Sequence, residues 1–199
     1  MGARETAEID AALPSVTAYV RGLPAGWSSY PECAARGRLL GSLAVTGALD
    51  GLEGLPDALA RHLPTLSAGW IPEVVHVGLM LAVRDRRFAG AGGEDAFLAW
   101  LHRLNGAVMP ERSDPRAAVL ELPTIWSSLH TGTVLEVREA SESSALLAAR
   151  HPEPLFPALA SRWRCDAIAG LLVRSGAVQP RVTQHPYAGG ETLLAITWT

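Results

Sequence analysis

The sequence predicts an α+β fold in which helices pack on one face of a small antiparallel β-sheet. The N-terminal two-thirds of the chain space their apolar residues mainly as helices do, whereas from Gly132 onward the period changes to the alternation typical of strands. The C-terminal third has the order hairpin, helix, hairpin and ends near Trp198. With 199 residues, 48% of them apolar, and no internal repeat or linker, the chain is expected to form a single globular domain over residues 1–199.

The first third is predicted to begin with a strand at 15–21, because Val16, Ala18 and Val20 alternate with more polar neighbours. A helix is then predicted to begin at 30–32 and to end at Gly47. Its apolar residues recur at three- and four-residue spacing: Leu39, Leu40, Leu43 and Ala44. A further short helix is predicted with Pro56 in its first turn.

The strongest helix prediction follows Pro72, where residues 74–83 are apolar nearly all round and so indicate a central packed helix. Another helix is predicted after the glycine-rich stretch 89–93. A third is predicted to be capped by Asp114, with Pro115 in its first turn, and to run into Pro123.

In the last third, residues 133–138 alternate as a strand and are predicted to pair with a second run that reaches Arg150. An apolar stripe from Leu155 to Leu171 predicts a long helix, and Gly176 is expected to supply its left-handed C-cap. The final hairpin is predicted to pair 178–184 with 193–198 across a turn at 187–190.

Composition excludes several classes of function. All 17 basic residues are Arg, so mechanisms that need a lysine ammonium, such as Schiff-base, pyridoxal-phosphate and P-loop chemistry, are excluded. A net charge of -3 provides no basic stripe for nucleic acid, and no nucleic-acid partner is expected.

The two cysteines, Cys33 and Cys165, are far apart and form no C-x-x-C pair, which is typical of buried thiols in a reducing compartment. The first ten residues contain no apolar segment of a secretory signal. The apolar run 74–83 is too short to cross a bilayer. We therefore expect a cytoplasmic protein without a membrane partner.

No metal or cofactor is predicted. The six histidines lack the H-x-x-x-H or H-x-H spacing of a metal site: His62, His76, His102, His130, His151 and His185. Glu73 and His76 share one helix face and form half of a di-iron carboxylate motif, but that chemistry needs a second copy and two further Glu. We expect His76 to be a core or capping residue.

Local signals of nucleophilic catalysis are also missing, since the sequence contains no G-x-S-x-G motif. The six tryptophans outnumber the three phenylalanines, which indicates either core packing or an apolar cavity between helices and sheet. Trp70 and Trp126 are expected to be buried, because each lies near a proline at a helix end. The candidate ligand- or partner-binding residues are Trp70, His76, Trp100, Trp126 and Trp163.

Short patterns along the chain resemble a myxobacterial paralogous family of unknown function. They comprise Val20-Arg21-Gly22, Trp70-Ile71-Pro72, Trp126 with Gly132, Gly170 with Gly176-Ala177, and Trp198. This resemblance implies no reaction or ligand. More distantly, the order hairpin, helix, hairpin resembles the four-vinyl-reductase domain of bacterial sensors and the related transport-particle subunits, which implies small-molecule binding or dimerisation. The Cys-rich zinc site of such sensors is not carried over, because residues 182–186 contain no cysteine.

Two hypotheses about function remain open. The first is a non-catalytic binding, sensory or scaffolding module for an apolar small molecule or a protein partner. The second is an enzyme whose site is assembled only by the fold, with His76, His102 or His130 as general base. A homodimer is predicted, because the helices near 70–83 and 155–173 carry apolar residues on more than one face.

Overall fold

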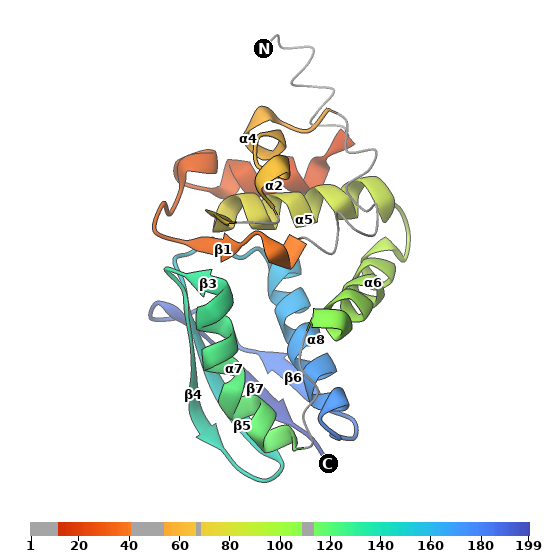
Figure 1. Cartoon of the computed structure of the whole chain (residues 1–199), viewed down its shortest axis with the longest axis vertical. Helices are drawn as coiled ribbons and strands as arrows, with labels where there is room; N and C mark the ends of the chain where they lie inside the picture. The colour runs from red at the N-terminus through yellow and green to blue at the C-terminus, as the bar shows by residue number, and fades with distance from the viewer. Residues whose placement is uncertain (1–11, 41–53, 67–68, 109–113) are drawn as a thin grey trace. The chain divides into compact units, whose positions relative to one another are not determined.

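A computed structural model describes residues 12–40, 54–66, 69–108 and 114–199 (Figure 1). They belong to two compact units, Met1–Phe97 and Leu98–Thr199, here called the N-terminal unit and the C-terminal unit. The described helices are α2 (Pro14–Gly22), α4 (Asp57–Ala60), α5 (Glu73–Arg87), α6 (Gly93–Val108), α7 (Pro115–Leu129) and α8 (Ala158–Arg174). The strands are β1 (Ala34–Arg36), β2 (Trp70–Pro72), β3 (His130–Thr131), β4 (Val134–Ala140), β5 (Ser144–Arg150), β6 (Arg181–Gln184) and β7 (Glu191–Thr197).

Helix α5 is the centre of the N-terminal unit, as the sequence predicts. Eight of its apolar side chains are buried on several sides of the helix: Val74, Val75, Val77, Leu79, Met80, Leu81, Ala82 and Val83. Gly78 lets the indole of Trp27 approach, since a Cβ at this position would lie 2.6 Å from two atoms of that ring. Helix α2 packs against α5, and β1 pairs with β2 in antiparallel register, Ala35 opposite Ile71.

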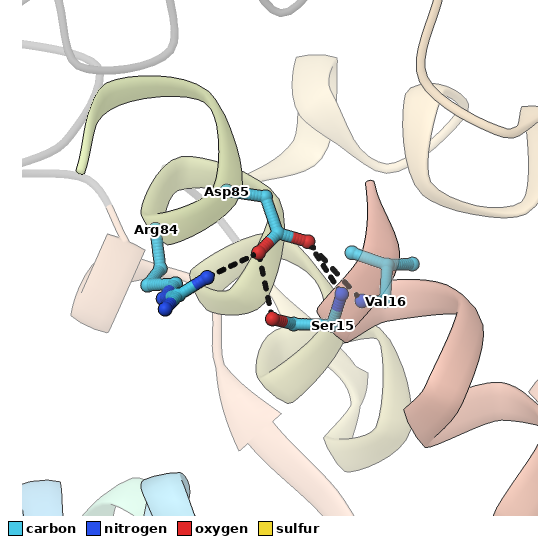
Figure 2. Close-up of polar contacts among 4 residues, drawn as sticks. All are labelled: Ser15, Val16, Arg84 and Asp85. Carbon is cyan, nitrogen blue, oxygen red and sulfur yellow. Dashed lines mark hydrogen bonds and ion pairs between the residues drawn. The ribbon is translucent and has the colours of Figure 1, made fainter. Parts of the chain in front are cut away.

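The predicted strand at 15–21 is wrong, because this segment is helix α2. Val16 and Tyr19 are buried three residues apart, whereas Ala18 is exposed, so the side chains follow a helical period. The N-terminus of α2 is capped from α5 (Figure 2). The Asp85 carboxylate accepts hydrogen bonds from the Ser15 N–H at 2.7 Å, the Ser15 hydroxyl at 2.6 Å and the Val16 N–H at 3.4 Å. Arg84 forms an ion pair with the same carboxylate at 3.0 Å.

The helix predicted from 30–32 is also wrong over its first half. Residues 34–36 form β1, and a short helical stretch begins only at Arg38. Strand pairing prevails here because the chain lies close to a distant segment, where Gly37 N–H donates to the Gly69 carbonyl at 2.8 Å. A Cβ on Gly37 would lie 2.5 Å from the Leu66 carbonyl oxygen. The remainder of that predicted helix, with Leu43, Ala44 and Gly47, lies outside the described residues.

The C-terminal unit confirms the α+β prediction, with two helices on one face of an antiparallel sheet of order β4-β5-β7-β6 (Figure 1). Inward-facing residues of the sheet and of helices α7 and α8 form one core: Ala118, Val119, Leu122, Leu135, Ala145, Leu147, Ala149, Ile168, Leu171, Leu172, Ala177, Leu194, Ile196 and Trp198. Both predicted hairpins are present, and Gly176 adopts the expected positive φ of 93°.

Helix α7 begins where the sequence predicts but extends further. Asp114 caps it by accepting hydrogen bonds from the N–H groups of Arg116 at 3.0 Å and Ala117 at 3.2 Å. The helix continues through Pro123 to Leu129, although proline removes one helical hydrogen bond. Packing on the sheet compensates for that loss, and Trp126 in the following turn packs against the core. No described helix is long and apolar enough to cross a membrane.

Candidate functional site

An aromatic cluster lies at one end of the sheet in the C-terminal unit. We define it as Trp126, His130, His151, Phe156, Arg164 and Tyr187. The register pairs Val134 with Arg150 and Arg150 with Glu191, so β4 and β7 begin at the end where β5 finishes. The C-terminal part of α7, the β5–α8 connection and the turn before β7 therefore meet there.

Trp126 and His130 form the first part of this cluster. Their rings are stacked, with centroids 4.0 Å apart and an interplanar angle of 17°. The indole N–H donates to the Thr133 hydroxyl at 3.0 Å, which fixes the ring plane. His130 is buried and Trp126 is half-buried. One edge of the indole is thus held within the unit while part of the ring surface stays accessible.

Phe156 joins Trp126 to the rest of the cluster. Its ring meets the Trp126 ring edge-on at 6.4 Å and the His151 ring edge-on at 4.9 Å. The Arg164 guanidinium carbon lies 5.2 Å from the centroid of the Phe156 ring, within cation–π range. Arg164 is buried on α8, so its charge acts in an environment of low dielectric constant.

His151 forms polar contacts through both of its ring nitrogens. Its Nδ1 lies 3.1 Å from the Pro152 carbonyl oxygen, which can only accept, so Nδ1 carries the proton. In the neutral ring Nε2 then accepts from the Thr192 hydroxyl at 3.4 Å. Burial lowers the pKa of His151, Arg164 lowers it further, and the bond to Pro152 opposes both effects. His151 is therefore neutral near neutral pH.

A second arrangement of titratable groups lies in the N-terminal unit. The fully buried Glu73 carboxylate is 3.0 Å from His76 Nδ1, and the His76 side chain is 18% exposed. Burial, then Glu32 and Glu73, raise the pKa of the Cys33 thiol to about 11. Burial and Glu73 likewise raise the pKa of Tyr19. The Glu73–His76 pair orients the imidazole as a general base requires. The Cys33 thiol, whose pKa is raised, stays protonated and is unsuited to nucleophilic attack.

Metal binding by several side chains does not fit the described residues. Among them, no three or more His, Cys, Asp or Glu side chains gather as a metal-binding group. Cys33 and Cys165 are both free thiols.

The five candidate residues from the sequence are divided between the two units. Trp70 on β2 and His76 on α5 belong to the N-terminal unit. Trp100 on α6, Trp126 on α7 and Trp163 on α8 belong to the C-terminal unit, and all three are half-buried. Of the five, only Trp126 is a member of the aromatic cluster.

The predicted burial of Trp70 is wrong, since this side chain is 40% exposed. Trp70 points outward from β2, where its cross-strand partner is Arg36. The Arg36 guanidinium carbon lies 4.1 Å from the centroid of the indole ring. The neighbouring Ile71 is buried instead, because side chains alternate along a strand.

The other proposed general bases differ in their surroundings. His102 is exposed on α6, and its ring lies against Gly170 of α8, where a Cβ would be 2.5 Å from His102 Cε1. His130 is buried and stacked on Trp126. His76 contacts the Glu73 carboxylate through Nδ1 at 3.0 Å, and this contact orients its ring.

Sequence reasoning missed His151, Phe156, Arg164 and Tyr187 as site residues. They come from a connection, a helix and a turn that only the sheet register brings together, and no local spacing marks them. The one available signal was His151-Pro152 directly after a predicted strand, a position where polar side chains often collect at a sheet end.

Known proteins resemble this chain in fold alone. No family model matches the chain, and no curated protein matches it. The structure is similar to that of the Fe(II) unliganded H-NOX protein from K. algicida, with a TM-score of 0.55 and 10% identity over 82% of this chain and 96% of that chain. A point mutant of the same protein gives a TM-score of 0.53 and 9% identity, with the same coverage. At these identities the similarity establishes a shared fold.

Proposed function

We propose that this chain is a non-catalytic sensory or binding module that holds a planar, apolar small molecule against the aromatic cluster. The observation that carries the proposal is the convergence of three half-buried rings, Trp126, Phe156 and Tyr187, at one end of the sheet. Ligand sites are typically lined by aromatic side chains with a few fixed polar groups. The fold similarity to the H-NOX protein supports the same class of function.

Each part of the cluster has a role in this proposal. The accessible parts of the Trp126 and Phe156 rings provide apolar surface on which a planar ligand can stack. The Arg164 guanidinium gives this surface a positive electrostatic potential, which favours ligands with electron-rich or weakly acidic groups, and the neutral His151 adds no charge of its own. A protein partner remains the alternative occupant.

A fluorescence titration with 1-anilinonaphthalene-8-sulfonate, an aromatic probe with an acidic group, tests the proposal. We expect saturable binding near neutral pH, and Phe156→Ala should weaken it about tenfold, equivalent to about 1.4 kcal/mol. Trp70→Phe is the matched control, because it alters an exposed aromatic residue in the other unit. Equal affinities for Phe156→Ala and the unmodified protein would refute the site.

An enzyme remains the second candidate, favoured by the Glu73–His76 pair. A buried carboxylate on Nδ1 fixes the imidazole tautomer and directs Nε2 outward as a base. If this is correct, His76→Gln and Glu73→Gln should both lower hydrolysis of an activated ester such as p-nitrophenyl acetate, while His102→Gln should not. Under the binding proposal, all three variants hydrolyse the ester at the rate of the unmodified protein.

We further propose a homodimer in the cytoplasm without a bound metal. The support for self-association is exposed apolar surface in the C-terminal unit, at Leu120, Val173 and Val178. Light scattering coupled to gel filtration at micromolar concentration should give the mass of two chains.

Elemental analysis of protein purified without an affinity tag should find no stoichiometric zinc or iron, and one equivalent per chain would contradict the proposal that no metal is bound.

A further inference from the structure

His151, the first residue after β5, joins the β5–α8 connection to β7 and to the turn that precedes β7. Its backbone carbonyl accepts the Tyr187 hydroxyl at 2.9 Å, which holds the turn before β7. Its Nε2 contacts Thr192 on β7, and its Nδ1 contacts the carbonyl of the next residue in the β5–α8 connection, Pro152. Its ring packs against Phe156 at 4.9 Å and against Tyr187 at 5.2 Å. Both rings belong to the proposed ligand surface.

The charged neighbour of this imidazole is a cation. Arg164 faces it from α8, whereas the turn before β7 presents the phenol of Tyr187 and β7 presents the uncharged Thr192. The adjacent Arg150 is paired with Glu136. A proton on His151 would therefore place a second positive charge beside Arg164 in a buried environment, which is unfavourable.

The direction of the resulting pH dependence follows from these contacts. Folding lowers the pKa of His151 below its ordinary value of 6.5, mainly through burial; the bond to Pro152 opposes this shift, and Arg164 adds a smaller lowering of its own. The unfolded chain then binds its proton at a higher pH than the folded chain. The stability that neutral His151 contributes is complete above pH 6.5 and is lost as the pH falls from there toward the folded-state pKa.

We propose that His151 is a positioning residue that makes the aromatic cluster respond to pH. When neutral, it holds Phe156 and Tyr187 in the arrangement that binds a planar ligand; when protonated, it releases the β5–α8 connection and the turn before β7, and the ligand dissociates. The inference rests on the proposed function in its ligand-binding part only. The conformational part concerns the protein alone and is tested without ligand.

Hydrogen–deuterium exchange of the whole chain tests the conformational part. We expect residues 151–157 and 185–191 to lose amide protection between about pH 8 and about pH 5, after correction for the intrinsic exchange rate. In His151→Gln this protection should be low at every pH. His62→Gln is the matched control, because the pKa of His62 is also lowered, mainly by burial, but it lies in the N-terminal unit. Constant protection in the unmodified protein, or a pH response that persists in His151→Gln, would overturn the proposal.

Titration with 1-anilinonaphthalene-8-sulfonate over the same pH range tests the ligand part. The Kd of the probe should rise about twofold at the pH that equals the pKa of His151, and about tenfold at one pH unit below it. The control variant His62→Gln should show the same rise as the unmodified protein. In His151→Gln the Kd should be high and independent of pH. A Kd that is constant with pH in the unmodified protein contradicts the inference and leaves the proposed site intact. Loss of protection without any probe binding contradicts the proposed function and leaves the response of His151 to pH intact.

Discussion

The two units position their helices through contacts of different sequence range. In the N-terminal unit, α2 is capped by Asp85, a buried residue 70 positions away on α5. In the C-terminal unit, α7 is capped by Asp114, an exposed residue two and three positions before the N–H groups that it accepts. In both units an aspartate carboxylate caps the N-terminus of a helix. A helix whose cap is distant depends on tertiary structure, whereas a helix whose cap is adjacent is encoded locally.

The largest expected effect is the loss of the distant cap. Asp85→Ala should lower the free energy of unfolding by about 3–4 kcal/mol, because it removes three hydrogen bonds to a charged acceptor. The half-buried Ser15 N–H and the buried Val16 N–H would then lose this acceptor. Asp114→Ala should cost about 1 kcal/mol, the usual value for a helix cap. Chemical denaturation of both variants measures this difference. Equal losses would mean that the long-range contact contributes no more than a local cap.

This contrast explains which elements the sequence could predict. Asp114-Pro115 identifies the start of α7, and the alternation after Gly132 identifies β4 and β5, because both signals reside in the residues that adopt the structure. The pattern Val16, Ala18, Val20 satisfies the period of a strand equally well. The carboxylate from α5 favours a helix there, and no window of residues 15–21 contains it.

The candidate site was less predictable for the same reason. Aromatic character predicts Trp126 as a site residue, and Trp126 lies in the cluster. The same property predicts Trp70, which instead is exposed on β2. Phe156, Arg164 and Tyr187 enter through the register of β4, β5 and β7, which depends on a bulge between Val137 and Glu139 and on side chains across the sheet. A single sequence does not specify that register.

The two tryptophans offer a second comparison between the units. Trp126→Ala should cost about 2–3 kcal/mol, slightly less than deletion of a fully buried tryptophan, because the ring is half-buried and its N–H bonds to Thr133. Trp70→Ala should cost about 1 kcal/mol or less, since its main described contact is the exposed cation–π pair with Arg36. Urea denaturation measures both losses. A larger loss at Trp70 than at Trp126 would reverse this assignment.

A smaller effect is expected at Gly78, where propensity and packing oppose each other within α5. Gly→Ala inside a helix normally gains about 1 kcal/mol, but a methyl group here would clash with the Trp27 ring and overpacking costs about 1–3 kcal/mol. We therefore expect Gly78→Ala to destabilise the protein by about 1 kcal/mol. Gly22→Ala in α2 is the control, because nothing lies within 4 Å of its added Cβ, and it should be neutral or slightly stabilising. A stabilising Gly78→Ala would show that the indole can move aside.

The smallest effect is expected on the sheet face opposite α7 and α8, which carries a network of four charged side chains. Arg138 pairs with Glu191 at 2.9 Å and with Glu136 at 3.5 Å, and Arg150 pairs with Glu136. Because Arg138 is 42% exposed and Glu191 27% exposed, water screens the attraction between them. A double-mutant cycle of Arg138→Ala and Glu191→Ala should give a coupling energy of about 0.5 kcal/mol that declines with added salt. A coupling above about 2 kcal/mol would mean that the network is desolvated. In that case an ion pair between residues distant in the sequence would stabilise the C-terminal unit as strongly as a desolvated contact does, and the contrast with the Asp85 cap would no longer separate the two units.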